Sequence, residues 1–176
     1  NDFTVIAMDA LVNSSEKMLG LYSDIVLNPA FLDAEVARAK SQTIAQQQKK
    51  IDNPSTFAND AFDEFLFKGH PYANDITGMP ASVRKISKRD IIRHYLNNYR
   101  PNNSQLAVVG RFDRSFETKV AEAFKKWPGK PIRDFSTPEL KPIEGLEVKL
   151  VSKAGLQQAQ IRLGAFGIRR NDPDFL

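Results

Sequence analysis

The polar segment from Glu35 to Asn53 predicts one long helix, which Pro54 ends. Asp33 stands where the N-cap residue of this helix is expected. Pro54 follows Asn53 in the first-turn position that proline favours, so a second helix is expected to begin there. The apolar residues of this second helix recur at helical spacing as far as Gly69, which indicates one buried stripe.

Three further helices are marked by caps and by apolar periodicity. One follows Asn13 or Ser14, one begins at a capping box of Ser87 with Asp90, and one follows Asp113. Each carries apolar residues at three- and four-residue spacing, which indicates a single buried face on each helix.

Strand-like patterns lie between and after these helices. Residues 3–11 and 106–109 are short apolar runs, and Gly110 follows the second, as in a central strand covered on both faces. Residues 146–150 and 159–165 alternate apolar with polar side chains, which predicts two half-buried antiparallel strands. Because helices and strands occur in blocks and not in strict alternation, the sequence predicts an α+β fold with an antiparallel or mixed sheet.

A proline-rich stretch divides the chain. Residues 128–145 contain four prolines and no stable periodicity, which is typical of a linker. The sequence therefore predicts three parts, which are residues 1–127, the linker at 128–145, and residues 146–176. The chain starts without methionine, enters a strand-like run almost at once and stops without a helix-end signal, so we expect a fragment of a longer protein.

Composition excludes several classes of protein. At 41% apolar content the chain can bury a core, but no apolar run approaches the roughly 18 residues that span a bilayer. The absence of cysteine excludes disulfides and thiolate chemistry. The net charge of +4 is spread along the chain, and its densest basic patch lacks interleaved aromatic residues, so nucleic-acid binding is not expected. That patch consists of Arg84, Lys85, Lys88, Arg89 and Arg93.

A series of short motifs follows the first long helix. They are Phe67-Lys-Gly-His-Pro-Tyr72, Gly78, Tyr99-Arg-Pro-Asn-Asn103 and Val108-Val-Gly110. In the order and spacing of these motifs the chain resembles the peptidases with an inverted zinc motif, the M16 family of pitrilysin, insulinase and the mitochondrial processing peptidase. The resemblance implies a repeated α+β half-domain with helices packed on one face of its sheet. On that comparison, residues 1–127 are the later part of one half and residues 146–176 are the opening strands of the next.

The resemblance also locates one expected zinc ligand. In this family, zinc is held by both histidines of a His-x-x-Glu-His helix and by a distant glutamate, while the glutamate of the motif activates the zinc-bound water. Alignment at Arg38 and at Asp52-Asn-Pro54 places the distant ligand at Gln46, or at Ala45 or Gln47 if the alignment shifts by one residue.

None of these three residues is a carboxylate, and a neutral amide does not offset the charge of the ion. Glu35 lies 11 residues from Gln46, about 16 Å along a helix, so it cannot replace the ligand. We therefore expect no metal site and no catalytic residue in this chain. The alternative is that the alignment is off and that the helix is an ordinary polar surface helix.

Two other groups of residues are candidates for a site. His70 and His94 are 24 residues apart and neither belongs to a two-histidine helical motif; we expect His70 to fix a turn and His94 to lie on a helix surface. Residues 157–161 resemble the start of the family's next half-domain, where a strand borders the substrate chamber. The resemblance makes Gln158 and Gln160 candidates for peptide contact by strand addition, beside the plainer interpretation of an ordinary sheet strand.

The sequence therefore favours the metal-free half of a two-part zinc endopeptidase, a half that helps to enclose a peptide substrate. The resemblance implies Zn²⁺ in a catalytic half, on another domain or subunit, and a dimeric arrangement. A second hypothesis is a peptide-binding or assembly scaffold without proteolytic activity. A third is an active parent chain in which the alignment at Gln46 is wrong. The compartment stays open, with the bacterial periplasm favoured over the mitochondrial matrix.

Overall fold

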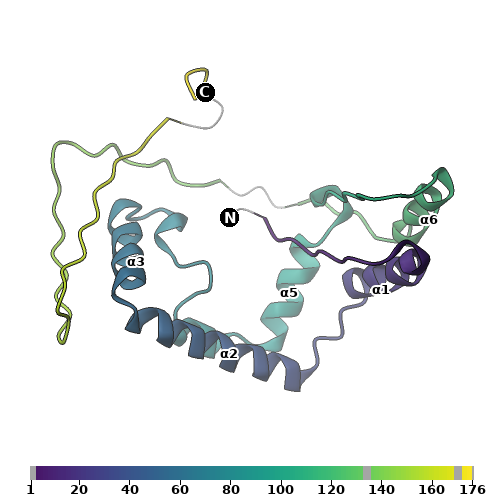
Figure 1. Ribbon diagram of the computed structural model, residues 1–176, viewed down its shortest axis with the longest axis horizontal. Coiled ribbons are helices and arrows are strands. Elements are labelled where there is room, and N and C mark those ends of the chain that lie inside the picture. The colour runs from purple at the N-terminus through teal and green to yellow at the C-terminus, as the bar shows by residue number, and fades with distance from the viewer. Residues whose placement is uncertain (1–2, 133–135, 169–171, 176) are drawn as a thin grey trace. The chain divides into compact units, whose positions relative to one another are not determined.

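The computed structural model describes residues 3–132, 136–168 and 172–175 and is built from helices joined by extended segments (Figure 1). It divides into two compact units. The first unit contains the described residues of Asn1–Arg38 and Ile86–Asp134, and the second those of Ala39–Lys85 and Phe135–Leu176. The helices are α1 (Ser15–Leu27), α2 (Asp33–Asp52), α3 (Pro54–Leu66), α4 (Pro80–Lys85), α5 (Lys88–Asn98) and α6 (Arg114–Phe124), with short 3-10 turns η1 (Val12–Ser14), η2 (Pro71–Ala73) and η3 (Pro101–Asn103).

In the first unit, α1 packs on α6 and α5. The ring of Tyr22 meets the ring of Phe124 edge to face, with 6.2 Å between their centroids. The hydroxyl of Tyr95 on α5 donates to the carbonyls of Val26 and Leu27, which lie at the end of α1. These carbonyls have no partner further along the helix, so Tyr95 satisfies acceptors that the helix leaves open.

Helix caps fix the starts of α3, α5 and α6 as the sequence predicts. The Asn53 side chain accepts the Thr56 backbone N–H, and the Asp113 side chain accepts that of Phe116. Ser87 and Asp90 form the complete capping box at the start of α5. The predictions of helices after these caps are confirmed.

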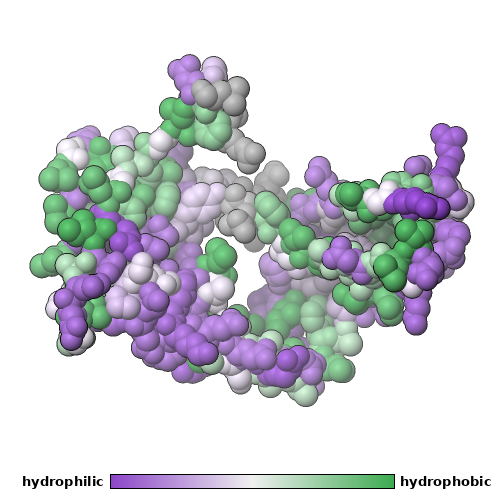
Figure 2. All heavy atoms as spheres, in the orientation of Figure 1, coloured by the Kyte–Doolittle hydropathy of each residue, from purple (hydrophilic) through white to green (hydrophobic). Residues whose placement is uncertain are grey.

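The second unit contains the rest of α2 together with α3, α4, η2 and an extended segment that we call the arm (residues 146–166). The long predicted helix is confirmed as α2, and Figure 2 shows hydrophilic side chains gathered along it. Between α3 and η2, Gly69 has a φ of +82°, in the left-handed region that favours glycine. Val83 of α4 is 6% exposed and is the buried apolar residue of this unit among those described.

The arm contacts α3 on both sides of its turn at residues 154–155, first toward the start of the helix and then back toward its end. Lys149 pairs with Glu64 at 3.0 Å, while Arg162 bonds to residues of the first turns of α3. The fit is close at Gly164, where a Cβ atom would come within 2.8 Å of the ring of Phe62. The rings of Phe166 and Phe67 lie 5.7 Å apart at the far end of the helix.

The predicted α+β fold is wrong for the described residues, because no strand lies among residues 3–132, 136–168 and 172–175. Outside the helices, their backbone hydrogen bonds belong to turns and caps. A strand exists only when a neighbouring strand pairs with its N–H and C=O groups, and residues 106–109, predicted as a central strand, have no such neighbour. Val109 is 95% exposed, and so is Leu150 of the arm. Figure 2 shows hydrophobic side chains on the surface where the arm runs.

The predicted linker at 128–145 has neither helix nor strand in its described residues, 128–132 and 136–145. The division into residues 1–127 and 146–176 around it stays a prediction.

Candidate functional site

The three residues at or beside the predicted ligand position differ in their exposure to solvent. Gln46 and Ala45 are exposed on α2, while Gln47 is 4% exposed. The Gln47 side-chain amide donates a hydrogen bond to the hydroxyl of Thr77, in the loop between η2 and α4. Glu35 is also exposed and pairs with Arg38 within the first turns of α2. The inward-facing amide of this helix is therefore already engaged by protein.

Gln47 belongs to a polar network that joins α2, α3 and the loop before α4. The Thr77 hydroxyl and backbone N–H both donate to a carboxylate oxygen of Asp75, at 2.7 and 2.8 Å. The Lys50 ammonium pairs with the other oxygen of Asp75 and, at 3.0 Å, with Asp60 of α3. The Asp75 side chain is 8% exposed, so this carboxylate is the buried centre of the network.

The network changes the acidity of its two central groups. Burial by itself raises the pKa of Asp75, but the hydrogen bonds from Lys50 and Thr77 outweigh it and lower the pKa to about 2. Burial lowers the pKa of Lys50, but the hydrogen bonds and charges of Asp75 and Asp60 outweigh it, so the net shift is upward. Both groups are therefore held in their charged forms at neutral pH.

These residues do not fit zinc. Zinc sites in proteins use thiolate, imidazole or carboxylate ligands, and the inward residue of α2 is an amide. Of the two carboxylates in the network, Asp75 is paired with the Lys50 ammonium and accepts two hydrogen bonds from Thr77, and Asp60 shares the same ammonium. Within the part of the chain that the structure describes, no group of three or more His, Cys, Asp or Glu is placed to hold a metal ion.

The two histidines take structural and surface positions. His70 is 8% exposed, and its ring Nδ1 accepts the backbone N–H of Tyr72 at 3.1 Å, which fixes the turn into η2. The interpretation of His70 as a turn residue is confirmed. His94 is exposed on α5 beside Asn98, as expected for a surface residue.

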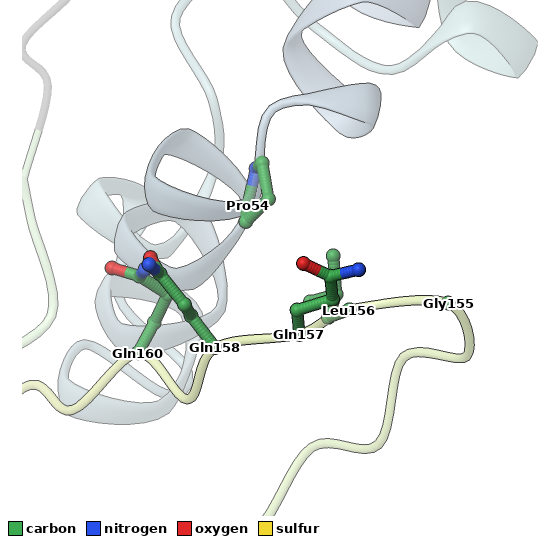
Figure 3. A pocket seen from close by; sticks show the side chains of 6 residues that line it. All are labelled: Pro54, Gly155, Leu156, Gln157, Gln158 and Gln160. Carbon is green, nitrogen blue, oxygen red and sulfur yellow. The ribbon is translucent and has the colours of Figure 1, made fainter.

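A shallow pocket of about 270 Å³ lies where the arm passes the start of α3 (Figure 3). Pro54, the first residue of α3, forms one side of the pocket, and the turn of the arm forms the other. Figure 3 shows the side chains of Gln158 and Gln160 extending from the arm in the same direction. The lining residues are Pro54, Gly155, Leu156, Gln157, Gln158 and Gln160.

No lining residue of this pocket is charged. Three glutamines offer amide donors and acceptors, and Pro54 and Leu156 offer apolar surface. Such a lining suits a neutral polar segment, such as a peptide backbone with uncharged side chains, and offers no group for acid, base or nucleophilic catalysis. The structure thus brings the sequence candidates Gln158 and Gln160 into one pocket.

Sequence reasoning missed the other wall of this pocket and the Lys50 network. Pro54 was recognised as a helix start, and nothing in its context indicated that the arm returns to it. Asp75 and Thr77 carry a recognisable Asx-turn pattern before Gly78, which predicts the turn but not its ion pair with a residue 25 positions earlier.

Comparison with known proteins places the chain in a family. A family model described as "Peptidase M16 inactive domain" matches residues 85–176, just over half of the chain. The chain is 28% identical over 171 residues to the uncharacterized zinc protease YmfH of Bacillus subtilis, covering 95% of this chain and 38% of that protein. It is 22% identical over 122 residues to the probable mitochondrial-processing peptidase subunit beta of Schizosaccharomyces pombe, covering 69% of this chain and 26% of that protein.

A solved structure agrees with these matches. The crystal structure of a peptidase M16 inactive domain from Pseudomonas fluorescens is similar with a TM-score of 0.63 and 26% sequence identity, covering 74% of this chain and 31% of that one. The chain therefore belongs to the M16 peptidase family, as its motifs indicated, and matches the inactive domain of that family. It spans about a quarter to two fifths of the length of these relatives.

Among the described residues, no helix is both long and apolar enough to cross a bilayer.

Proposed function

We propose that this chain is part of the metal-free half of an M16-type zinc endopeptidase and that it helps to enclose a peptide substrate. The catalytic half, with the zinc ion, would lie on another domain or on a partner subunit, and the two halves would act as a pair. The relative named as a processing-peptidase subunit is consistent with such a partnership. The observation that carries the proposal is the family match to an inactive domain.

The chemistry around α2 supports a metal-free role. The position aligned with the distant glutamate is Gln46, which is neutral and exposed. The neighbouring Gln47 is engaged by Thr77, and Lys50 places an ammonium group in the same network as the nearest carboxylates. A cation already built into the protein disfavours a second cation beside it.

The pocket between Pro54 and the arm supports a peptide-binding role. Its glutamines can exchange hydrogen bonds with a peptide backbone, and its lack of charge suits an unfolded substrate of varied sequence. We propose Gln158 and Gln160 as the peptide-contacting residues. Binding is expected to be weak at this pocket alone, because the pocket is shallow and most of an enclosing surface would come from the other half.

Peptide binding tests this proposal. The intact protein is titrated into a fluorescein-labelled, unfolded casein peptide, and binding is followed by anisotropy. Removing both amides in a Gln158→Ala, Gln160→Ala variant is expected to weaken binding about tenfold, because two neutral hydrogen bonds contribute about 1.4 kcal/mol together. Gln42→Ala, at an exposed glutamine of α2 outside the pocket, is the matched control and should leave the affinity unchanged.

An unchanged affinity in the double variant would remove the pocket from the proposal. If the intact protein and its partner bind the peptide and never cleave it, the scaffold hypothesis becomes the better account.

A further inference from the structure

Two basic side chains bracket the part of the arm that lines the pocket. Lys153 lies two residues before Gly155, and Arg162 lies two residues after Gln160. Both side chains are partly buried, and both reach across to the helices that the arm passes. These two side chains attach the arm to α2 and α3 on either side of the pocket.

Lys153 is bound to the end of α2. Its ammonium donates to the carbonyl of Ile51, one residue before the helix ends at Asp52. The last carbonyls of a helix have no helical partner and lie at the negative end of its dipole, so a cation is favoured there. The same ammonium lies 4.8 Å from the centroid of the Phe57 ring on α3, within the range of a cation–π interaction.

Arg162 is bound to the start of α3. Its guanidinium donates to the Asn59 side chain, to the Ser55 hydroxyl at 2.9 Å and to the Ser55 carbonyl at 3.1 Å. A planar guanidinium that donates to three acceptors on adjacent turns fixes direction as well as distance. The same side chain is 3.5 Å from the amide oxygen of Gln160, a pocket residue.

The attachments made by Lys153 and Arg162 lie on the two sides of the pocket. Along the helices, Ile51 and Ser55 lie on either side of Pro54, and along the arm, Lys153 and Arg162 lie on either side of the lining residues 155–160. The turn of the arm lies between these two attachments, so it cannot move away from Pro54 without breaking one of them. We propose that Lys153 and Arg162 are positioning residues that hold the glutamines of the arm opposite Pro54 and so create the pocket.

A third basic residue of the arm provides a matched control. Lys149 pairs with Glu64 at 3.0 Å, but the side chains are 36% and 68% exposed. Exposed ion pairs of this kind contribute little, because solvent screens the charges and the side chains lose freedom. Lys149 also lies outside the bracket around the pocket, so its removal should not change the position of the glutamines.

The test measures the distance between the arm and α3 in the intact protein. This chain contributes no cysteine, so spin labels can be placed on cysteines introduced at Asp63, on the exposed side of α3, and at Gln157. Pulsed electron paramagnetic resonance then gives the distribution of distances between the two labels. We expect a single narrow distribution in the otherwise unchanged protein and in Lys149→Met, and a distribution at least about twofold broader in Lys153→Met and Arg162→Met, because each loses one attachment.

Conservative variants separate positioning from general stability. Lys153→Arg keeps a cation for the Ile51 carbonyl and should restore the narrow distribution, whereas Arg162→Lys keeps the charge but loses the three-acceptor geometry and should stay broad. A broad distribution in the otherwise unchanged protein, or a narrow one in both methionine variants, would overturn the inference.

That the pocket binds peptide rests on the proposed function, whereas the positioning role of Lys153 and Arg162 does not. Peptide affinity is therefore measured in a separate experiment. Lys153→Met and Arg162→Met are expected to weaken binding of the casein peptide about tenfold, as the double glutamine variant does. If the arm loosens in these variants and the unmodified protein binds no peptide, the proposed function fails and the positioning role stands. If peptide binds and the arm does not loosen, the positioning role fails alone.

Discussion

Replacing Asp75 by asparagine is expected to lower the free energy of unfolding at pH 7 by about 1 to 2 kcal/mol. The pKa of Asp75 falls from an ordinary 3.8 to about 2 in the folded chain, and a shift of one unit corresponds to about 1.4 kcal/mol. Lys50 is 32% exposed, so solvent screens part of the pair and we expect the lower part of the range implied by the shift. Chemical denaturation of both proteins measures the difference.

The pH dependence of this difference gives an independent check. Because the folded pKa of Asp75 is below its unfolded value, its contribution is complete above about pH 4 and is lost as the pH falls toward 2. The two proteins should therefore differ at pH 7 and nearly coincide at pH 2. Asp60→Asn is the matched control; Asp60 is 39% exposed, so its effect should stay below about 1 kcal/mol. Equal effects of the two substitutions would contradict the burial argument.

Replacing Phe67 by alanine is expected to lower the free energy of unfolding by about 2 to 3 kcal/mol. Phe67 is the residue that follows the end of α3. The centroid of its ring lies 5.8 Å from that of Tyr72, 6.3 Å from that of His70 and 5.7 Å from that of Phe166 on the arm. One side chain therefore joins a helix end, the histidine turn and the arm. The ring is half-buried, so we expect less than the full cost of removing a buried phenylalanine.

A second phenylalanine shows whether this effect comes from packing or from loss of any aromatic ring. Phe112 is 43% exposed, and among the described residues its ring contacts that of Phe116, with 6.3 Å between the centroids. Phe112→Ala should cost less than about 1 kcal/mol in the same denaturation experiment. A loss as large as that of Phe67→Ala would contradict the assigned packing role.

Local signals in the sequence predicted the helices well. Asn53, Ser87 and Asp113 each cap the helix expected of them, and Pro54 begins α3. These signals depend on hydrogen bonds that span three residues, so the sequence contains both partners of each bond. The turn at His70 was predictable for the same reason, because its acceptor and donor are two residues apart.

The strands were wrongly predicted because pairing is not a local property. The alternation at 146–150 describes a segment that is able to pair on one face, but a ladder also needs a neighbouring strand at the right distance. In the described structure this segment lies along α3 through Lys149, while Leu146 and Leu150 are 82% and 95% exposed. The alternation wrongly implied that the apolar side chains of this segment are covered.

The candidate site was predictable in part. The resemblance placed the zinc-ligand position at Gln46, or at Gln47 if the alignment shifts by one residue. In the structure, Gln47 is the buried one of the two. The resemblance identified Gln158 and Gln160 as candidates. It did not identify Pro54, which lines the same pocket because the arm folds back against the start of α3. Contacts between residues about 100 positions apart leave no trace in a single sequence.

Zinc titration of the 176-residue chain tests the metal-free assignment most directly. After removal of bound metals with a chelator, calorimetry should show no stoichiometric binding, because Gln46 is an amide, the inward Gln47 is engaged by Thr77, and the Lys50 ammonium already pairs with Asp75 and Asp60. A Gln46→Glu variant should behave in the same way, since one restored carboxylate does not supply the three protein ligands that a catalytic zinc requires. Tight binding of one zinc ion by the unmodified chain would contradict this account.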